Sequence, residues 1–130
     1  MSATRFRLEI GGATLEGRLN TSKTAAAVAA ACPIELQLSR CGDEYYGSCG
    51  VAAVAAADAR DAMEVGEVAY WPPGQALCIF FGPTPASVGD EPRAASPVNP
   101  LGSIDGERSQ VIAALAALPG NVAARLTLTD

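Results

Sequence analysis

Aromatic side chains that suit a binding pocket are concentrated in the middle of the chain. Six of the seven aromatic residues lie between positions 45 and 81, and the seventh is Phe6. Tyrosine and tryptophan combine an apolar body with a polar tip, so they suit a pocket wall that is partly hydrated. We expect Tyr45, Tyr46 and Trp71 to line such a pocket. The alternative is a core cluster that leaves the hydroxyl groups at its rim.

Two polar residues, Arg93 and Asn99, lie in a segment rich in glycine, proline, serine and alanine that spans residues 82–100. Long connections in compact domains are often functional. We expect this segment to be a loop that faces the aromatic residues, so that Arg93 and Asn99 bind the carboxylate or amide of a ligand. The alternative is a structural role, in which the asparagine caps a turn and the arginine lies in solvent.

Acidic residues offer a different chemistry, general acid–base catalysis. Glu44, Glu67, Asp90 and Glu91 are the candidates, but their spacing singles out no pair. Catalysis predicts a carboxyl group with a raised pKa inside the pocket. Simple binding predicts an aromatic pocket without a shifted titratable group.

Composition excludes several kinds of catalytic and cofactor site. The chain has no histidine, which excludes Ser-His-Asp and Cys-His arrangements. It also lacks the glycine-rich loops that bind phosphate groups. Without a CxxC spacing, the four cysteines are predicted to be reduced, unpaired packing residues: Cys32, Cys41, Cys49 and Cys78. We therefore expect no cofactor and no metal site.

Length and charge limit the class of protein. The chain of 130 residues is predicted to form one domain over residues 1–130. Nine basic residues against 14 acidic ones give a net charge of −5, which argues against a nucleic-acid partner. The first residues lack the apolar core of a signal peptide, and no apolar run is long enough to cross a bilayer. We expect a soluble, cytoplasmic protein without a membrane partner.

The start of the chain predicts a β-hairpin. Two runs of alternating apolar and polar residues flank a Gly-Gly turn at residues 11–12. A two-residue turn of this kind would pair Leu8 with Leu15 and Arg7 with Glu16, apolar on apolar and positive on negative.

An alanine-rich helix is expected next, over residues 23–32. Asn20, Thr21 and Ser22 are alternative N-cap residues, because each side chain can accept a hydrogen bond from a free helix N–H group. Pro33 is expected to end the helix.

The rest of the chain is predicted to be mainly strands. They are expected over residues 34–40, 44–49, 65–71, 76–81, 98–105 and 122–129, with an irregular stretch over 50–62 and a second helix over 107–118. Tight turns between sequential strands favour antiparallel pairing. The predicted fold class is mainly β: a closed, largely antiparallel β-barrel of about eight strands with one or two helices capping its ends.

A proline-rich corner, Pro72-Pro73-Gly74, joins the two central strands. Proline has no N–H group to donate to a sheet, so two in succession belong in a turn or at an edge. Gly74 is expected to adopt the positive φ that reverses the chain. The strand that follows is nearly all apolar, which predicts burial on both faces.

The sequence VGEVAYWPPGQALCIFFGPTP over residues 65–85, followed by ASPVNPLGSI over 95–104, resembles a family of small bacterial and archaeal proteins with a cyclophilin-like fold. The resemblance covers most of the chain. It implies the cyclophilin-like β-barrel and, because the family is largely uncharacterised, no particular activity.

Cyclophilins themselves imply a proline-binding pocket with a phenylalanine in its wall. The matching FFG sequence implies that Phe81 lines such a pocket and that Phe80 lies in the core. Cyclophilin isomerases also use an arginine with histidine and glutamine neighbours. This chain has no histidine, Arg40 cannot be aligned with that arginine, and Gln75 precedes the strand. Efficient prolyl isomerisation is therefore not expected.

The favoured function is a non-catalytic binding module. Its aromatic pocket, built from Tyr46, Trp71, Phe81 and loop residues, would hold a small molecule or a proline-containing peptide. One alternative is an enzyme, either a weak prolyl isomerase or one that uses carboxylates and Arg93 on a small substrate. A further alternative is an interaction protein whose aromatic-proline corner docks another chain, with a homodimer as one outcome.

Overall fold

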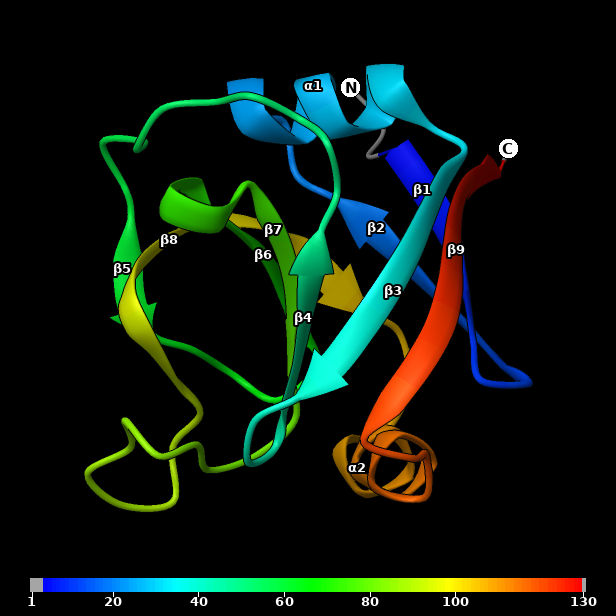
Figure 1. Cartoon of the computed structure of the whole chain (residues 1–130), viewed down its shortest axis with the longest axis vertical. Helices are drawn as coiled ribbons and strands as arrows, with labels where there is room; N and C mark the ends of the chain where they lie inside the picture. Colours follow the sequence, from blue (N-terminus) through cyan, green and yellow to red (C-terminus); the bar gives the residue numbers. More distant parts are fainter. Residues whose placement is uncertain (1–3, 130) are drawn as a thin grey trace.

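The computed structural model describes residues 4–129, and most of its regular structure is strand (Figure 1). The elements in chain order are β1 (Thr4–Ile10), β2 (Ala13–Leu19), α1 (Lys23–Ala31), β3 (Ile34–Arg40), β4 (Glu44–Ser48), β5 (Arg60–Ala62), β6 (Glu67–Trp71), the 3-10 turn η1 (Pro72–Gly74), β7 (Ala76–Phe80), β8 (Arg93–Ile104), α2 (Arg108–Ala116) and β9 (Asn121–Thr129).

The strands pair in antiparallel fashion and close into a ring. Their order is β2-β1-β9-β3-β4-β7-β6-β8-β5, and an additional pairing of β2 with β8 closes eight of them on themselves. The short strand β5 pairs with β8 and with no other described strand, and it lies outside this ring. Helix α1 lies at one end of the ring and α2 at the other (Figure 1). The predicted mainly β, antiparallel fold of about eight strands with helices at the ends is confirmed.

The first hairpin has the predicted register. Leu8 faces Leu15, and Arg7 faces Glu16. The Arg7 guanidinium forms an ion pair of 3.1 Å with the Glu16 carboxylate. Both residues of the Gly-Gly turn have positive φ, 55° and 89°, a conformation that glycine adopts at low cost.

The helix after the hairpin begins at one of the three predicted caps. The Ser22 hydroxyl accepts a hydrogen bond from the Ala25 N–H at 3.1 Å. The helix ends at Ala31, one residue before the predicted end, and a cis peptide bond joins Cys32 to Pro33. Its small residues let it lie flat against the end of the ring, where it buries Val28.

The apolar residues form two cores on the two sides of the β6–β7 sheet. The larger core fills the ring and includes Leu77 and Ile79 of β7. The smaller one, here called the outer cluster, lies outside the ring and comprises Met63, Ala69, Cys78, Phe80, Ala94 and Val98. Every residue of β7 is buried, so the predicted burial of this strand on both faces is confirmed.

The segment predicted as a long loop is shorter than expected. Strand β8 begins at Arg93, so that only residues 81–92 connect it to β7. The first half of β8 is stabilised by pairing with β5, where Arg60 faces Val98 and Ala62 faces Arg93. The sequence predicts irregular structure for the residues of β5. The two segments are distant in the sequence, so local composition does not predict that they pair. The prolines are tolerated because β8 has register irregularities against both neighbours.

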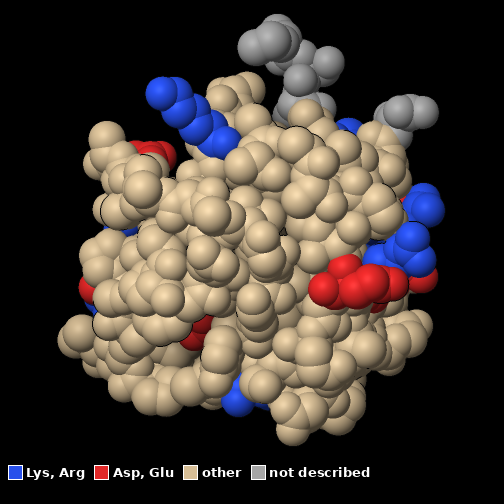
Figure 2. Space-filling view, turned by 45° about the horizontal axis from the view of Figure 1, so that its top comes forward, with Lys and Arg blue, Asp and Glu red and all other residues tan. Residues whose placement is uncertain are grey.

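Charged side chains do not gather into a single field in the view of Figure 2. They lie mainly around the margin, and most of the face shown is uncharged. Within residues 4–129, no helix has the length and apolar character needed to cross a bilayer.

Candidate functional site

A cavity of about 230 Å³ lies outside the ring, against the outer cluster. It is bordered by residues from β4, β6, β7, β8 and the turn before β4: Cys41, Glu44, Tyr46, Trp71, Cys78, Ala94, Ala95 and Val98. We call it the outer cavity. Its wall is mostly apolar with a few polar groups, the usual composition of a small-molecule site.

Trp71 is held in the cavity wall by two restraints. Its indole N–H donates a hydrogen bond of 2.7 Å to the Ser96 hydroxyl on β8. Its ring also lies so close to Gly74 that a Cβ atom there would be only 2.8 Å from two ring carbons. The glycine is therefore needed to make room for the indole.

This packing corrects the prediction for the proline-rich corner. Gly74 does not have a positive φ; the left-handed residue is Gln75, with φ of 46°. The two prolines and the glycine form a 3-10 turn, and the Gln75 N–H closes it by donating to the Pro72 carbonyl at 3.2 Å. The reversal of φ therefore comes one residue later than expected.

The two tyrosines of β4 point to opposite sides of the sheet, as alternation along a strand requires. Tyr46 borders the outer cavity and is 40% exposed. Tyr45 is fully buried inside the ring, where its hydroxyl donates to the carbonyls of Leu118 and Pro119, 3.0 and 2.7 Å away. Of the two predicted pocket residues, only Tyr46 reaches the cavity.

The two phenylalanines also lie on opposite sides, and Phe80 lies in a core cluster as predicted, whereas Phe81 does not border the cavity. Phe81 is only 1% exposed and stacks on Tyr45 within the ring, with ring centroids 5.8 Å apart. Phe80 belongs to the outer cluster that underlies the cavity. The expectation that Phe81 forms the pocket wall is not met, because Phe81 faces the interior of the ring. The outer side, which β8 and β5 cover, carries Phe80 instead.

Glu44 gives the cavity its one carboxyl group. Desolvation by the surrounding apolar residues raises its pKa to about 7, against the smaller opposing effect of hydrogen bonding from the Cys78 thiol. Sequence spacing left Glu44 as one of four carboxylates. The overlooked signal was its position two residues before Tyr46, on the same side of a strand.

The other carboxylates predicted as candidates do not border the cavity. Glu67 forms an ion pair with Arg60, Glu91 pairs with Arg93, and Asp90 is exposed.

Two cysteines border the cavity, and they differ in exposure. Cys78 is buried, and desolvation followed by the nearby Glu44 charge raises the pKa of its thiol well above the usual value. It therefore stays protonated at neutral pH and is a poor nucleophile. Cys41 is exposed, so the prediction that it is a packing residue is wrong. Within residues 4–129, no three His, Cys, Asp or Glu side chains are placed to hold a metal ion.

Two other hollows lack the features of this site. One of about 270 Å³ surrounds the Gly-Gly turn of the first hairpin, and one of about 210 Å³ lies beside α1. Neither is bordered by an aromatic residue. We therefore place the candidate site in the outer cavity.

Comparison with known proteins agrees with the closed ring of strands. The family model described as cyclophilin-like matches residues 4–118. The chain belongs to the cyclophilin-like family. The solution structure of a hypothetical protein from Archaeoglobus fulgidus is similar to this cyclophilin-like chain, with 32% sequence identity, a TM-score of 0.79, and coverage of 98% of this chain and 95% of that one. No curated protein sequence matches the chain significantly.

Arg40, which precedes Tyr45 and Tyr46 in this cyclophilin-like chain, does not border the cavity. The guanidinium carbon of Arg40 lies 5.0 Å from the centre of the Phe81 ring. Its nitrogens donate to the Gly42 and Ala116 carbonyls and to the Asp43 carboxylate. Arg40 therefore links the turn between β3 and β4 to the end of α2.

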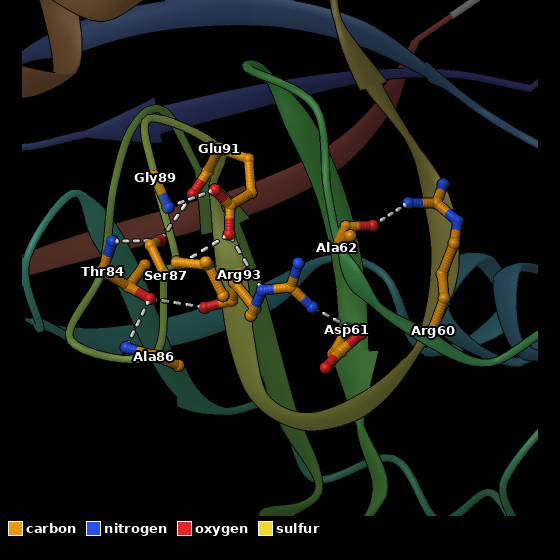
Figure 3. Close-up of polar contacts among 10 residues, drawn as sticks. Arg60, Asp61, Ala62, Thr84, Ala86, Ser87, Gly89, Glu91 and Arg93 are labelled. Carbon is orange, nitrogen blue, oxygen red and sulfur yellow. Dashed lines mark hydrogen bonds and ion pairs between the residues drawn. The ribbon is translucent and has the colours of Figure 1, made fainter.

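Arg93, predicted as a ligand-binding residue, is engaged by two carboxylates (Figure 3). It pairs with Glu91 at 2.9 Å and with Asp61 at 3.1 Å. The Glu91 carboxylate also accepts the N–H groups of Val88 and Gly89, and these bonds, with Arg93, lower its pKa to about 2. In this cyclophilin-like chain Arg93 therefore fixes the connection between β7 and β8 and does not border the cavity.

Asn99, the other predicted polar partner, is also structural. It is buried, and its amide nitrogen donates to the Thr24 hydroxyl at 3.0 Å and to the Val54 carbonyl at 2.9 Å. Its amide oxygen accepts the Ala56 N–H at 2.8 Å. The side chain joins α1 to the irregular segment before β5 and leaves no group for a ligand.

Proposed function

We propose that this cyclophilin-like domain binds a small molecule in the outer cavity. The observation that carries the proposal is that the fixed Trp71 ring and the Glu44 carboxyl group border the same cavity, and that no ion pair within residues 4–129 engages Glu44. Of the six residues predicted to bind a ligand, Tyr46 and Trp71 border this cavity. Tyr45, Phe81, Arg93 and Asn99 do not.

The physical case rests on groups that are ready to bind. Restraint of Trp71 by Ser96 and Gly74 lowers the conformational entropy that the wall would lose on ligand binding. Displacement of water from an apolar wall favours an apolar ligand body. A polar group on that body would then meet Glu44, whose desolvation leaves it short of hydrogen-bond partners.

A second candidate function, general acid–base catalysis, is favoured by the protonation state of Glu44. A pKa of about 7 lets this carboxyl group both donate and accept a proton at neutral pH. This is the feature that distinguishes catalysis from simple binding. The wall offers no second charged group to stabilise a transition state, so binding is the better-supported function.

Fluorescence of Trp71, the single tryptophan, provides the test. We would titrate the protein with a panel of small metabolites and proline-containing peptides. We expect a saturable change with at least one small molecule, and about tenfold weaker binding in Tyr46→Ala through loss of a wall residue. Leu128→Ala is the matched control, since Leu128 is 42% exposed on β9, away from the cavity. Silence from the whole panel, with Trp71 inaccessible to a quencher, would refute the proposal.

The catalytic candidate is tested on the same samples by a prolyl isomerisation assay. A saturable fluorescence change without faster isomerisation supports the binding function. Faster isomerisation that is lost in Glu44→Gln would instead support catalysis by the carboxyl group.

A further inference from the structure

The charge of the outer cavity is unusual for a chain with many ion pairs. Glu44 is the one charged residue in its wall, which contains no arginine or lysine. Arginines of β3, β5 and β8 form ion pairs with other carboxylates: Arg40 with Asp43, Arg60 with Glu67, and Arg93 with Asp61 and Glu91. Ionised Glu44 therefore gives the cavity a negative charge that no side chain in the described part of its wall balances.

The aromatic wall complements a positive charge as well. The Trp71 N–H group is used by Ser96, so the indole offers carbon surface to the cavity. Tyr46 lies on the same side of β4 as Glu44, two residues along the strand. Aromatic faces attract cations through their quadrupole, and tryptophan does so most strongly. A carboxylate beside two aromatic rings is the arrangement that binds an organic cation.

We propose that the ligand of the outer cavity is a small organic amine in its ammonium form, held between the Glu44 carboxylate and the rings of Trp71 and Tyr46. This inference rests on the proposed binding function and adds the chemical class of the ligand.

Binding of an ammonium group would be linked to one proton. Groups that face Glu44 from the surrounding elements are the thiols of Cys78 and Cys41, the Tyr46 phenol, the Trp71 ring, and the side chains of Ala94, Ala95 and Val98. None of these side chains belongs to a lysine, an arginine, an aspartate or a second glutamate. At pH values below 7, the cation would therefore displace the proton of the Glu44 carboxyl group into the solvent.

The sign of the pH dependence follows from this linkage. Because only ionised Glu44 attracts the cation, a pKa of about 7 makes amine binding about tenfold weaker at pH 6 than at pH 8. A neutral ligand that accepts a hydrogen bond would need the protonated carboxyl group. Its binding would strengthen as the pH falls.

Three probes of similar shape and different charge provide the test: benzylamine, benzyl alcohol and phenylacetate. We would measure their dissociation constants by Trp71 fluorescence and calorimetry at pH 6 and pH 8. We expect benzylamine to bind best and to show the tenfold dependence on pH. In Glu44→Gln, benzylamine should bind weakly and equally at both pH values. Glu35→Gln is the control, because the Glu35 side chain is 72% exposed and lies away from this cavity.

The outcomes separate the class of ligand from the existence of the site. Equal or tighter binding of benzyl alcohol or phenylacetate, with affinity that rises as the pH falls, would overturn the amine class and leave the binding function standing. A Glu44→Gln variant that keeps the pH dependence, while melting like the parent chain, would also overturn it. Failure of all three probes and of the metabolite panel would overturn the binding function as well.

Discussion

Neighbouring residues on the two faces of the β4–β7 strand pair differ in burial and in the partners of their polar groups. On the inner face, Tyr45 is fully buried, its hydroxyl is satisfied by two carbonyls, and its ring stacks on Phe81. On the outer face, Tyr46 is 40% exposed, and Glu44 has lost hydration without gaining a charged partner among residues 4–129. One strand therefore contributes both a completed core and an incomplete site.

The difference shows where function is to be sought in this fold. Groups that already have partners stabilise the chain and have little left for a ligand, as Arg93 and Asn99 illustrate. A carboxyl group that is desolvated and unpaired costs stability, and such costs are typical of functional sites. The outer face has that property, and the inner face does not.

The largest expected effect compares one aromatic residue from each face. Phe81→Ala should lower the free energy of unfolding by about 3–5 kcal/mol, because it leaves a cavity in the main core. Trp71→Ala should cost roughly 1–2 kcal/mol, because Trp71 is only partly buried. Urea denaturation measures both values. A larger loss for Trp71→Ala would make the outer face a core in its own right.

A smaller effect separates the two tyrosines. Tyr45→Phe should destabilise the chain by about 1–3 kcal/mol, since the carbonyls of Leu118 and Pro119 lose their buried donor. Tyr46→Phe should change stability by less than about 0.5 kcal/mol, because the Tyr46 side chain is exposed to solvent. Thermal unfolding of the two variants measures the contrast. Equal changes in melting temperature would contradict it.

The smallest effect concerns the carboxyl group of Glu44 and has an unusual sign. The folded chain binds its proton with a pKa of about 7, whereas the unfolded chain has a value near 4.5. Stability from this group is fully present below pH 4.5 and is lost as the pH rises through 7. Glutamine cannot ionise and avoids this loss.

Glu44→Gln should therefore stabilise the chain at pH 8 by roughly 1–2 kcal/mol, allowing for its partial exposure, and much less at pH 5. Urea denaturation at the two pH values measures the difference, with Glu35→Gln as the control that should show none. A loss of stability at pH 8 would mean that ionised Glu44 has a favourable partner, which would remove the contrast between the two faces.

The sequence predicts elements best where the pattern is local. The first hairpin, the Ser22 cap among its alternatives, and the burial of β7 on both faces all follow from alternation, turn chemistry and capping. Alternation also separates Phe80 from Phe81 correctly. It does not say which side of β7 is the inside of the ring, because both sides are covered by apolar residues, so the side on which Phe81 lies could not be predicted.

The site was less predictable because its geometry depends on pairing between distant segments. The outer cavity exists because β8 begins at Arg93 and brings Ala94, Ala95 and Val98 opposite β4 and β6. The pairing of β8 with β5 also brings Arg93 to Asp61, a contact that the order of charges along the sequence does not reveal. The raised pKa of Glu44 is a consequence of desolvation, so it becomes visible only when the apolar neighbours are in place.

Because the outer cavity lies outside the ring, ligand binding and folding of the main core depend on different residues, whereas many domains use the same residues for both. Residues 46, 71, 94 and 95 border the cavity without belonging to the main core. A library randomised at the exposed positions 46 and 95, with Trp71 retained as reporter, would therefore sample new specificities while the residues of both cores stay constant. The domain has the layout of a scaffold for engineered receptors, in which binding can be varied without redesign of the fold.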